Sequence, residues 1–222
     1  MPQKSNPSHA PIEPDHDCPL CPRLVEFRHK HRILSPDWFG GPVPCFGPLD
    51  ARLVIIGLAP GLKGAHRTGR PFTGDYAGEL LYTTLIKFGF ARGHYDARPD
   101  DGLTLQDCLI ANAVRCVPPE NKPTPQEINT CRRFLQNLLG NMPRLRHVLV
   151  LGRIAHDSFL RSIGKPLKEA PFRHGAMHKL ENLTLHDSYH CSRYNTQTGV
   201  LTQSMFEAVF ASIRKEIEKS GN

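Results

Sequence analysis

The chain has 222 residues, of which 39% are hydrophobic and 22% charged, a composition typical of one globular domain. No apolar run approaches the ~18 residues that a membrane-spanning helix needs, and the N-terminus is polar, which excludes membrane-spanning and secreted classes. The net charge of +7 favours a polyanionic partner such as nucleic acid. Seven cysteines without a signal peptide indicate thiols or metal ligands in a reducing, cytoplasmic compartment.

The chain begins with a proline-rich segment. Residues 1–17 contain four prolines and are expected to form a disordered lead-in, so the folded domain is expected to span residues 18–222. The domain opens on Cys18-Pro-Leu-Cys21, and the basic stretch Arg23 to Arg32 that follows favours a helix. The β-branched run Leu53 to Gly57 then predicts a strand buried on both faces of a parallel sheet. A glycine-rich loop over residues 57–74 follows this strand.

The same alternation of strand, loop and helix continues along the chain. Further strands are predicted at Cys108–Val114, His147–Leu151 and Leu183–Tyr189, and helices at Gly78–Phe88, from Thr124 onward, at Ile154–Leu160 and at Gln203–Lys219. The tetrad Thr124-Pro-Gln-Glu127 is a capping box with proline at the first helical position. This order predicts a single-domain α/β fold with a doubly wound, mostly parallel central sheet of about four strands flanked by helices.

Function is expected in the loops that leave the carboxyl ends of the strands, because ligands bind there in doubly wound sheets. These loops cover residues 57–74, 112–124 and 190–199. The segment Gly57-Leu-Ala-Pro-Gly61 lacks the endings of nucleotide-binding loops. The next segment, Arg67 to Asp75, combines cations, an aromatic residue and a carboxylate within nine residues.

Four of the cysteines have a spacing that suits metal ligands. Cys18 and Cys21 form a C-x2-C pair, while Cys116 follows the second predicted strand and Cys131 lies in the helix after it, with fourteen residues between them. Thiolates near a helix N-terminus suit either a four-iron cluster or a tetrathiolate zinc ion, and spacing alone does not distinguish the two. The alternative makes Cys131 a small core residue and the first pair incidental. The remaining cysteines are interpreted as free thiols: Cys45, Cys108 and Cys191.

Five ordered motifs between Cys18 and about Thr202 carry a family resemblance: Gly57-Leu-Ala-Pro-Gly61, Arg67-Thr-Gly-Arg-Pro-Phe-Thr-Gly-Asp75, Asn112-Ala-Val-Arg-Cys116-Val-Pro-Pro, Asn121-Lys-Pro-Thr-Pro125 and His190-Cys-Ser-Arg-Tyr-Asn195. Together they resemble the uracil-DNA glycosylase superfamily, and within it the type-5, UDGb-like, iron–sulfur branch. The resemblance implies a 4Fe-4S cluster bound through Cys18, Cys21, Cys116 and Cys131. Leu58 fits type 5, because type 4 has an acidic residue there.

A glycosylase of this kind flips a nucleotide into a pocket and hydrolyses its N-glycosidic bond. The substrate pocket is predicted to comprise Gly57, Leu58, Ala59, Phe72 and Asn112. Phe72 is the candidate stacking ring, with a core phenylalanine as the alternative, and the resemblance implies that Asn112 reads the uracil edge. Asn112 bracing a turn is the alternative.

Two residues are the catalytic candidates. The resemblance implies that His190 donates a hydrogen bond to the uracil oxygen that gains charge. Asp75 is assigned to water activation or to stabilisation of the oxocarbenium-like transition state. A carboxylate that only caps the following helix is the alternative role for Asp75.

DNA contacts are predicted at Arg67, Arg70, Lys122, Ser192, Arg193, Tyr194 and Asn195. Solvated surface residues are the alternative for all of them. The chain departs from the family pattern at two places, and both bear on substrate preference. Cys191 stands where proline is usual and is expected to loosen its loop. The segment Leu62-Lys-Gly-Ala-His66 replaces a run of small residues.

The sequence therefore predicts a monomeric, monofunctional DNA glycosylase of base excision repair that acts on uracil and other damaged bases in a bacterial-type cytoplasm, at the nucleoid. A non-catalytic nucleic-acid-binding module with a zinc knuckle is the alternative from another class, and a small-molecule hydrolase on the same sheet is a third. Iron or zinc in the purified protein, and cleavage of a uracil-containing duplex, distinguish them.

Overall fold

The computed structural model describes residues 13–219. Its helices are α1 (Pro22–Leu34), α2 (Ala65–Thr68), α3 (Tyr76–Lys87), α4 (Pro125–Gly140), α5 (Arg153–Ser162), α6 (Arg193–Gln197) and α7 (Gln203–Lys219). Its strands are β1 (Leu53–Gly57), β2 (Ala91–Arg92), β3 (Thr104–Leu105), β4 (Cys108–Asn112), β5 (His147–Leu151), β6 (Met177–Leu180) and β7 (Leu183–Ser188), with short 3-10 helices η1 (Pro119–Asn121) and η2 (Leu167–Glu169).

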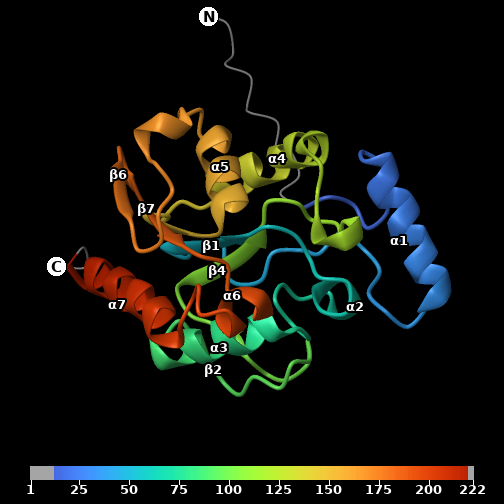
Figure 1. Ribbon diagram of the computed structural model, residues 1–222, viewed down its shortest axis with the longest axis horizontal. Coiled ribbons are helices and arrows are strands. Elements are labelled where there is room, and N and C mark those ends of the chain that lie inside the picture. Colours follow the sequence, from blue (N-terminus) through green and yellow to red (C-terminus); the bar gives the residue numbers. More distant parts are fainter. Residues whose placement is uncertain (1–12, 220–222) are drawn as a thin grey trace, which may run out of the picture.

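The central sheet has five strands in the order β4-β1-β5-β7-β6 and lies between two layers of helices (Figure 1). Successive side chains of a strand point to opposite faces. Leu53 and Ile55 of β1 therefore pack on the side of α3 and α7, whereas Val54 and Ile56 pack on the side of α4 and α5. Both faces of β1 are buried, so its residues show no polar alternation. The predicted α/β fold with a mostly parallel sheet is confirmed.

The sheet has one strand more than expected. β6 pairs antiparallel with β7 at the sheet edge, while all other neighbours in the sheet are parallel. Its sequence, Met-His-Lys-Leu, is largely exposed and holds no β-branched residue, so it lacks a strand signal. Two short helices, α2 and α6, also lie in segments that we expected to be irregular.

The capping box is confirmed in atomic detail. Thr124 Oγ1 accepts a hydrogen bond from Glu127 N (3.2 Å), and Glu127 Oε2 accepts one from Thr124 N (2.7 Å). These contacts fix where α4 begins, because they satisfy backbone donors that have no partner inside the helix. The capping box thus fixes the first residue of α4, the helix that follows β4 in the chain.

The order of the strands places a crevice at their carboxyl ends. From β1 the chain crosses to β4 on one side, and it then returns to β5 on the other side of β1. Connections that leave neighbouring strands in opposite directions open a ligand-binding crevice between them. The predicted functional loops all begin at this edge of the sheet.

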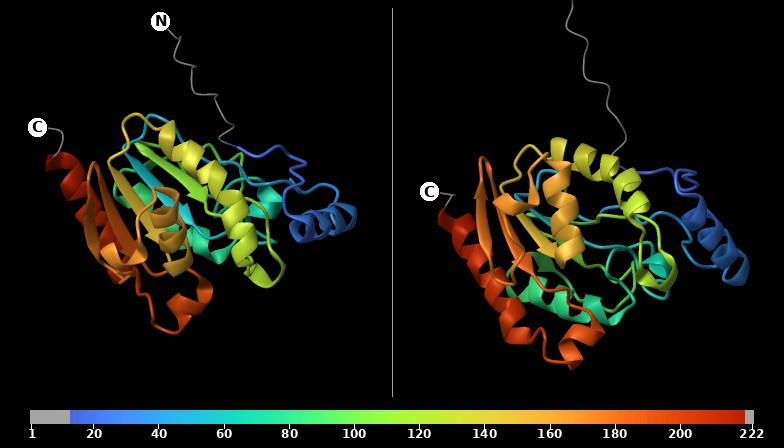
Figure 2. Two further views of the ribbon diagram at one scale, coloured as in Figure 1. Left: turned by 90° about the horizontal axis from the view of Figure 1, so that it is seen from above. Right: turned by 45° about the horizontal axis from the view of Figure 1, so that its top comes forward.

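Helix α1 lies at one end of the molecule, beside the segment that follows β4 (Figures 1 and 2). Leu24 of α1 packs with Val114 and with Phe134 of α4. Residues 1–12 of the expected lead-in lie outside the described part of the chain, whereas Glu13 and Asp17 contact the domain through Arg115 and Arg32. Among residues 13–219, no helix is long and apolar enough to cross a membrane.

Candidate functional site

A cavity of about 750 Å³ lies at the carboxyl ends of the strands. Four segments that are separate in sequence line it: the loop after β1 with the start of α3, the end of β4, η1 and the loop after β7. The predicted site residues that line it are Leu58, Ala59, Phe72, Asp75, Asn112, His190, Ser192 and Arg193. The structure therefore brings the predicted aromatic ring, amide, imidazole and carboxylate together at one cavity.

Phe72 and Asn112 lie against the backbone of Gly57 at the end of β1. A Cβ atom at Gly57 would lie 2.5 Å from Asn112 Oδ1 and 2.5 Å from Phe72 Cζ, so a side chain there would displace both. Phe72 itself has a positive φ of 53°, which is strained for an aromatic residue. Gly57 thus contributes space rather than a functional group.

Asn112 is buried at the wall of the cavity with an unsatisfied acceptor. The residue is 2% exposed, and its Oδ1 has no hydrogen-bond partner within the described chain. A buried polar atom without a partner costs about 1–3 kcal/mol. A planar ligand that offers an N–H group to Asn112 Oδ1 would remove this cost.

His190 lines the same cavity and lies next to the aromatic ring. The Phe72 and His190 rings are 6.0 Å apart between centroids and 30° from parallel. Burial lowers the pKa of His190 to about 4, so the imidazole is neutral near pH 7. A neutral imidazole still has one N–H to donate.

Asp75 lies at the start of α3, on the wall of the cavity. Its Oδ1 accepts a hydrogen bond from Gly78 N (3.3 Å) and caps α3, while the side chain also lines the cavity. Burial raises the pKa of Asp75 above 3.8, against the opposing effect of the backbone N–H groups of Gly78 and Ala77. A Cβ atom at Gly64 would collide with the carboxylate, so this position must stay small.

The loop after β7 forms one side of the opening. Ser192 caps α6 by accepting a hydrogen bond from Asn195 N (3.3 Å), and Asn195 Nδ2 donates to His190 O (2.8 Å). Asn195 therefore holds the loop in place rather than projecting from it. Arg193 and Tyr194 are exposed, and Tyr194 is 73% accessible. Both side chains are therefore accessible to a large ligand at the opening.

Cys191 belongs to this loop, and its side chain points into the core. It is completely buried, and its Sγ is 3.5 Å from Ala77 O in the first turn of α3. The side chain packs in the core on the α3 side of the sheet. The contact joins the loop of His190 to α3, the helix that Asp75 caps. We expected the missing proline to loosen this loop, but the packing of Cys191 indicates a loop that is held in place.

The predicted phosphate contacts differ in their surroundings. Arg67 and Lys122 are exposed, although Arg67 Nε donates to Lys63 O (2.9 Å) and Lys122 lies 3.7 Å from Glu120. Neither lines the cavity. Both remain candidates for contacts outside it.

Arg70 does not suit the predicted DNA contact, and this assignment is corrected. Its side chain is 5% exposed and forms two parallel hydrogen bonds with Asp101, at 2.8 and 2.7 Å. The guanidinium also lies over the rings of Phe46, Tyr82 and Tyr95. Arg70 thus stabilises the loop between α3 and β4, and its sequence neighbours gave no sign of a partner 31 residues away.

The Asp101→Asn variant should be destabilised by about 3–5 kcal/mol, because it leaves the Arg70 cation buried without its counter-ion. Hydrogen bonds from Arg70 hold the pKa of Asp101 well below 3.8, so the pair stabilises the fold above about pH 4 and loses this effect as the pH falls further. Thermal unfolding of both proteins between pH 3 and 7 measures it. Equal unfolding temperatures at pH 7 would contradict this role.

Among the lining residues that were not predicted as site residues, three have a side chain that can form hydrogen bonds: Lys63, Tyr76 and Asn121. The Arg193 guanidinium lies 5.3 Å from the centroid of the Tyr76 ring, so the two side chains meet at the opening. Asn121 has a positive φ of 57° in the loop between Cys116 and α4. Each of the three lies in or next to one of the family motifs, and this position in the sequence was the only sign that it could line the cavity.

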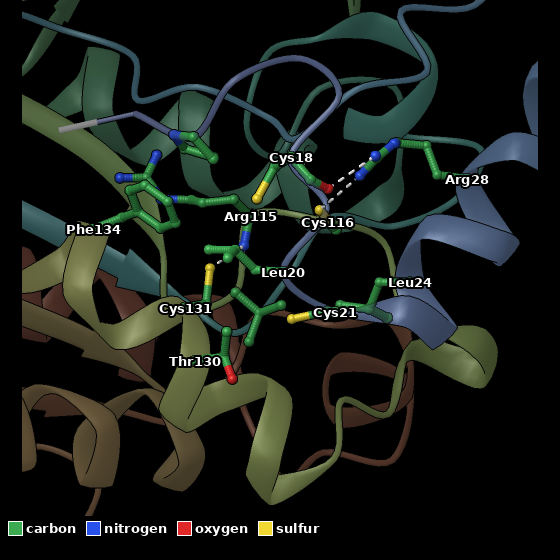
Figure 3. A pocket seen from close by; sticks show the side chains of 12 residues that line it. Cys18, Leu20, Cys21, Leu24, Arg28, Arg115, Cys116, Thr130, Cys131 and Phe134 are labelled. Carbon is green, nitrogen blue, oxygen red and sulfur yellow. Dashed lines mark hydrogen bonds between the residues drawn. The ribbon is translucent and has the colours of Figure 1, made fainter. Parts of the chain in front are cut away.

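The four cysteines with ligand spacing meet at a second, small pocket. Figure 3 shows the sulfur atoms of Cys18, Cys21, Cys116 and Cys131 around one space, with Leu24 and Phe134 among the apolar walls. Burial raises the pKa of Cys116 to about 12 and that of Cys131 to about 11. Neutral thiols would therefore prevail without a cation to stabilise the thiolates. Within residues 13–219, no three His, Cys, Asp or Glu side chains form a site ready to hold a single metal ion.

The family model and the similar proteins that match this chain carry the same family name. The family model described as "Uracil DNA glycosylase superfamily" matches residues 44–214. The chain is 43% identical to a type-5 uracil-DNA glycosylase of Thermus thermophilus, over 89% of this chain and 93% of that protein. It is 37% identical to a type-5 enzyme of Pyrobaculum aerophilum, over 84% and 83%, and 30% identical to a type-4 enzyme of the same organism, over 67% and 62%.

Proposed function

Because the chain belongs to the uracil-DNA glycosylase superfamily, we propose that it excises uracil from DNA as the first step of base excision repair. It hydrolyses the N-glycosidic bond and leaves an abasic site, as a monofunctional glycosylase. The type-5 enzymes match 84% to 89% of this chain, whereas the type-4 enzymes match 40% to 67% of it, and this supports the type-5 branch. We extend the proposal to other deaminated or damaged bases, and to a monomeric protein in a bacterial-type cytoplasm.

The unsatisfied Oδ1 of Asn112 is the observation that carries this proposal. Uracil offers one ring N–H beside a carbonyl oxygen, and a side-chain amide can pair with both groups. Asn112 Oδ1 would accept the uracil N–H and its Nδ2 would donate to the oxygen. The base must leave the duplex to reach this buried group, which is the general strategy of glycosylases.

The groups around Asn112 would hold and polarise the flipped base. Phe72 would stack on the pyrimidine, and Gly57 leaves room for the ring to approach. His190 would donate its N–H to the uracil oxygen that becomes negative as the base departs. The low pKa of His190 supports this role, since a neutral donor does not have to lose a proton to the leaving base.

Asp75 would act on the attacking water. The oxygen of water forms a bond to C1′ of the deoxyribose while the C1′–N1 bond breaks, and the bonding electron pair leaves with the uracil anion. One proton of the water passes to the Asp75 carboxylate. The negative charge of Asp75 also stabilises the oxocarbenium-like transition state before the proton moves.

Cys18, Cys21, Cys116 and Cys131 would hold a 4Fe-4S cluster. A single zinc ion needs all four sulfurs within about 2.3 Å of one point, whereas a four-iron cluster binds one thiolate at each of its corners. Four thiols from separate segments around a shared space suit one thiolate at each corner of such a cluster. When bound, the cluster would link the segment before α1, the segment after β4 and α4 through these four thiolates.

The Lys122→Ala variant should bind uracil-free and uracil-containing duplexes more weakly by a similar factor. Loss of one phosphate contact lowers the slope of log affinity against log salt by about 1. A matched control is Lys165→Ala, because Lys165 pairs with Glu181 (2.6 Å) near the amino end of β7, at the opposite edge of the sheet. An unchanged salt slope in the Lys122 variant would remove this contact from the proposal.

Incubation of the purified chain with a uracil-containing duplex, followed by heating in alkali, tests the proposed activity. Strand cleavage at the uracil position is expected, and none in the matched thymine duplex. Absence of cleavage above the buffer control would instead favour the non-catalytic binding module. Duplexes with hypoxanthine and etheno bases measure how wide the specificity is.

A further inference from the structure

Two arginine side chains are buried next to the four cysteines. Arg28 extends from α1 and Arg115 follows β4, and each is 1% exposed. Both line the small pocket together with the cysteines (Figure 3). An unpaired charge in the interior of a protein costs several kcal/mol. The burial of both side chains therefore requires negative groups close by.

Arg28 contacts sulfur and a carbonyl oxygen but no carboxylate among the described residues. Its Nη1 lies 3.5 Å from Cys116 Sγ, and its Nη2 donates to Cys18 O at 3.1 Å. Its Nε has no hydrogen-bond partner in the described chain. The neighbouring carboxylate of Asp17 pairs with Arg32 at the surface.

Arg115 is only partly compensated. Its Nη1 donates to Glu13 Oε2 (2.8 Å), while its Nη2 has no partner within residues 13–219. The backbone N–H of Arg115 points to the ligand set as well, since it donates to Cys131 Sγ at 3.3 Å. One carboxylate beside two buried guanidinium groups leaves the surroundings of the cysteines short of negative charge.

We propose that Arg28 is the charge-compensating residue of the cofactor held by the four cysteines, and that it raises the reduction potential of that cofactor. This inference rests on the proposed 4Fe-4S cluster. Four thiolates give such a cluster a net negative charge, which the buried guanidinium offsets. Net charge and hydrogen bonds to sulfur set the potential of iron–sulfur clusters, and a cation beside Cys116 Sγ favours the more negative, reduced form.

The test compares Arg28→Gln and Arg28→Lys with the wild-type chain, and Lys30→Gln is the control because Lys30 is an exposed cation on the same helix. Iron per chain, loss of visible absorption in excess chelator, and the midpoint potential are measured. In Arg28→Gln we expect a tenfold lower ratio of reduced to oxidised cluster at a fixed potential, a shift of about 59 mV for one electron. Chelator should also remove its iron several-fold faster. Arg28→Lys should lie closer to the wild type, and Lys30→Gln should match it.

Wild-type potential and iron retention in Arg28→Gln would overturn the proposal. If Arg28→Gln cannot be purified with iron, the iron content of Arg28→Lys tests the proposal instead. An iron-loaded Arg28→Lys would support a requirement for charge, whereas loss of iron from both would assign Arg28 a purely geometric role and overturn the proposal. Wild-type protein with zinc or no metal would overturn the cofactor itself, a failure that is distinguishable before any variant is compared.

Discussion

The Asp75→Asn variant should excise uracil roughly 10² to 10⁴ times more slowly than the wild-type chain, with nearly unchanged affinity for DNA. An amide cannot take the proton of the attacking water, and it removes the negative charge that is proposed to face the sugar. Asparagine is as good a helix cap as aspartate, so α3 should keep its hydrogen bond at Gly78 N. Single-turnover excision measures the chemical step, and equilibrium binding to the same duplex measures affinity.

Stability provides the control for this variant. The folded-state pKa of Asp75 is raised, so ionising the buried carboxylate costs folding free energy at pH values above that pKa. Asp75→Asn should therefore unfold at a temperature no lower than the wild type at pH 7. Asp75→Ala removes the cap as well and should unfold earlier. A wild-type excision rate in a folded Asp75→Asn variant would exclude Asp75 from the chemistry.

The raised pKa of Asp75 also predicts the acid limb of the pH–rate profile. The proposed mechanism needs the carboxylate, so the single-turnover rate should fall as the pH drops through a pKa above the ordinary value of 3.8. His190, with a pKa of about 4, is neutral near pH 7, where the rate should be on its plateau. The profile of Asp75→Asn should lack this limb.

Cys116→Ser and Cys131→Ser should each lose most of the iron and unfold at a markedly lower temperature. The two thiols lie in separate elements that the cluster would tie together, so binding free energy of the cluster is also folding free energy. Iron content per chain, visible absorption and thermal unfolding are the measurements. The matched control is Cys45→Ser, because Cys45 is half-buried and does not line the pocket.

Unchanged iron and unfolding temperature in both variants would refute the assignment of these ligands. Equal loss in the Cys45 variant would indicate a general sensitivity of the fold to thiol substitution. Uracil excision by iron-depleted protein at low temperature then separates the structural role of the cluster from the chemistry at Asp75.

Sequence patterns predicted those helices and strands whose burial pattern or capping residues can be recognised within the segment itself. The strand Leu53–Gly57 is buried on both faces and therefore uniformly apolar, and α7 carries one apolar stripe, so both match their predicted ranges. The capping box at Thr124 predicted the start of α4 for the same reason. β6 could not be predicted in this way, because its place at the sheet edge depends on pairing with β7.

The motifs predicted which segments form the site, but they could not predict which side chains are buried there or which partners they contact. Phe72, Asn112 and His190 line one cavity, as the family resemblance implied, although their roles stay predictions. The buried ion pair of Arg70 depends on Asp101 in a later loop, and nothing in its motif distinguishes a buried arginine from an exposed one. The same applies to Lys63 and Tyr76, which the fold turns toward the cavity.

The close approach of Gly64 to Asp75 limits how this chain can vary over evolutionary time. Any side chain at position 64 would push the carboxylate away from the water it is proposed to activate. Purifying selection should therefore act on a residue that has no functional group at all, as strongly as on the acid beside it. A survey of tolerated substitutions would find an invariant position here whose importance comes entirely from the volume it leaves empty.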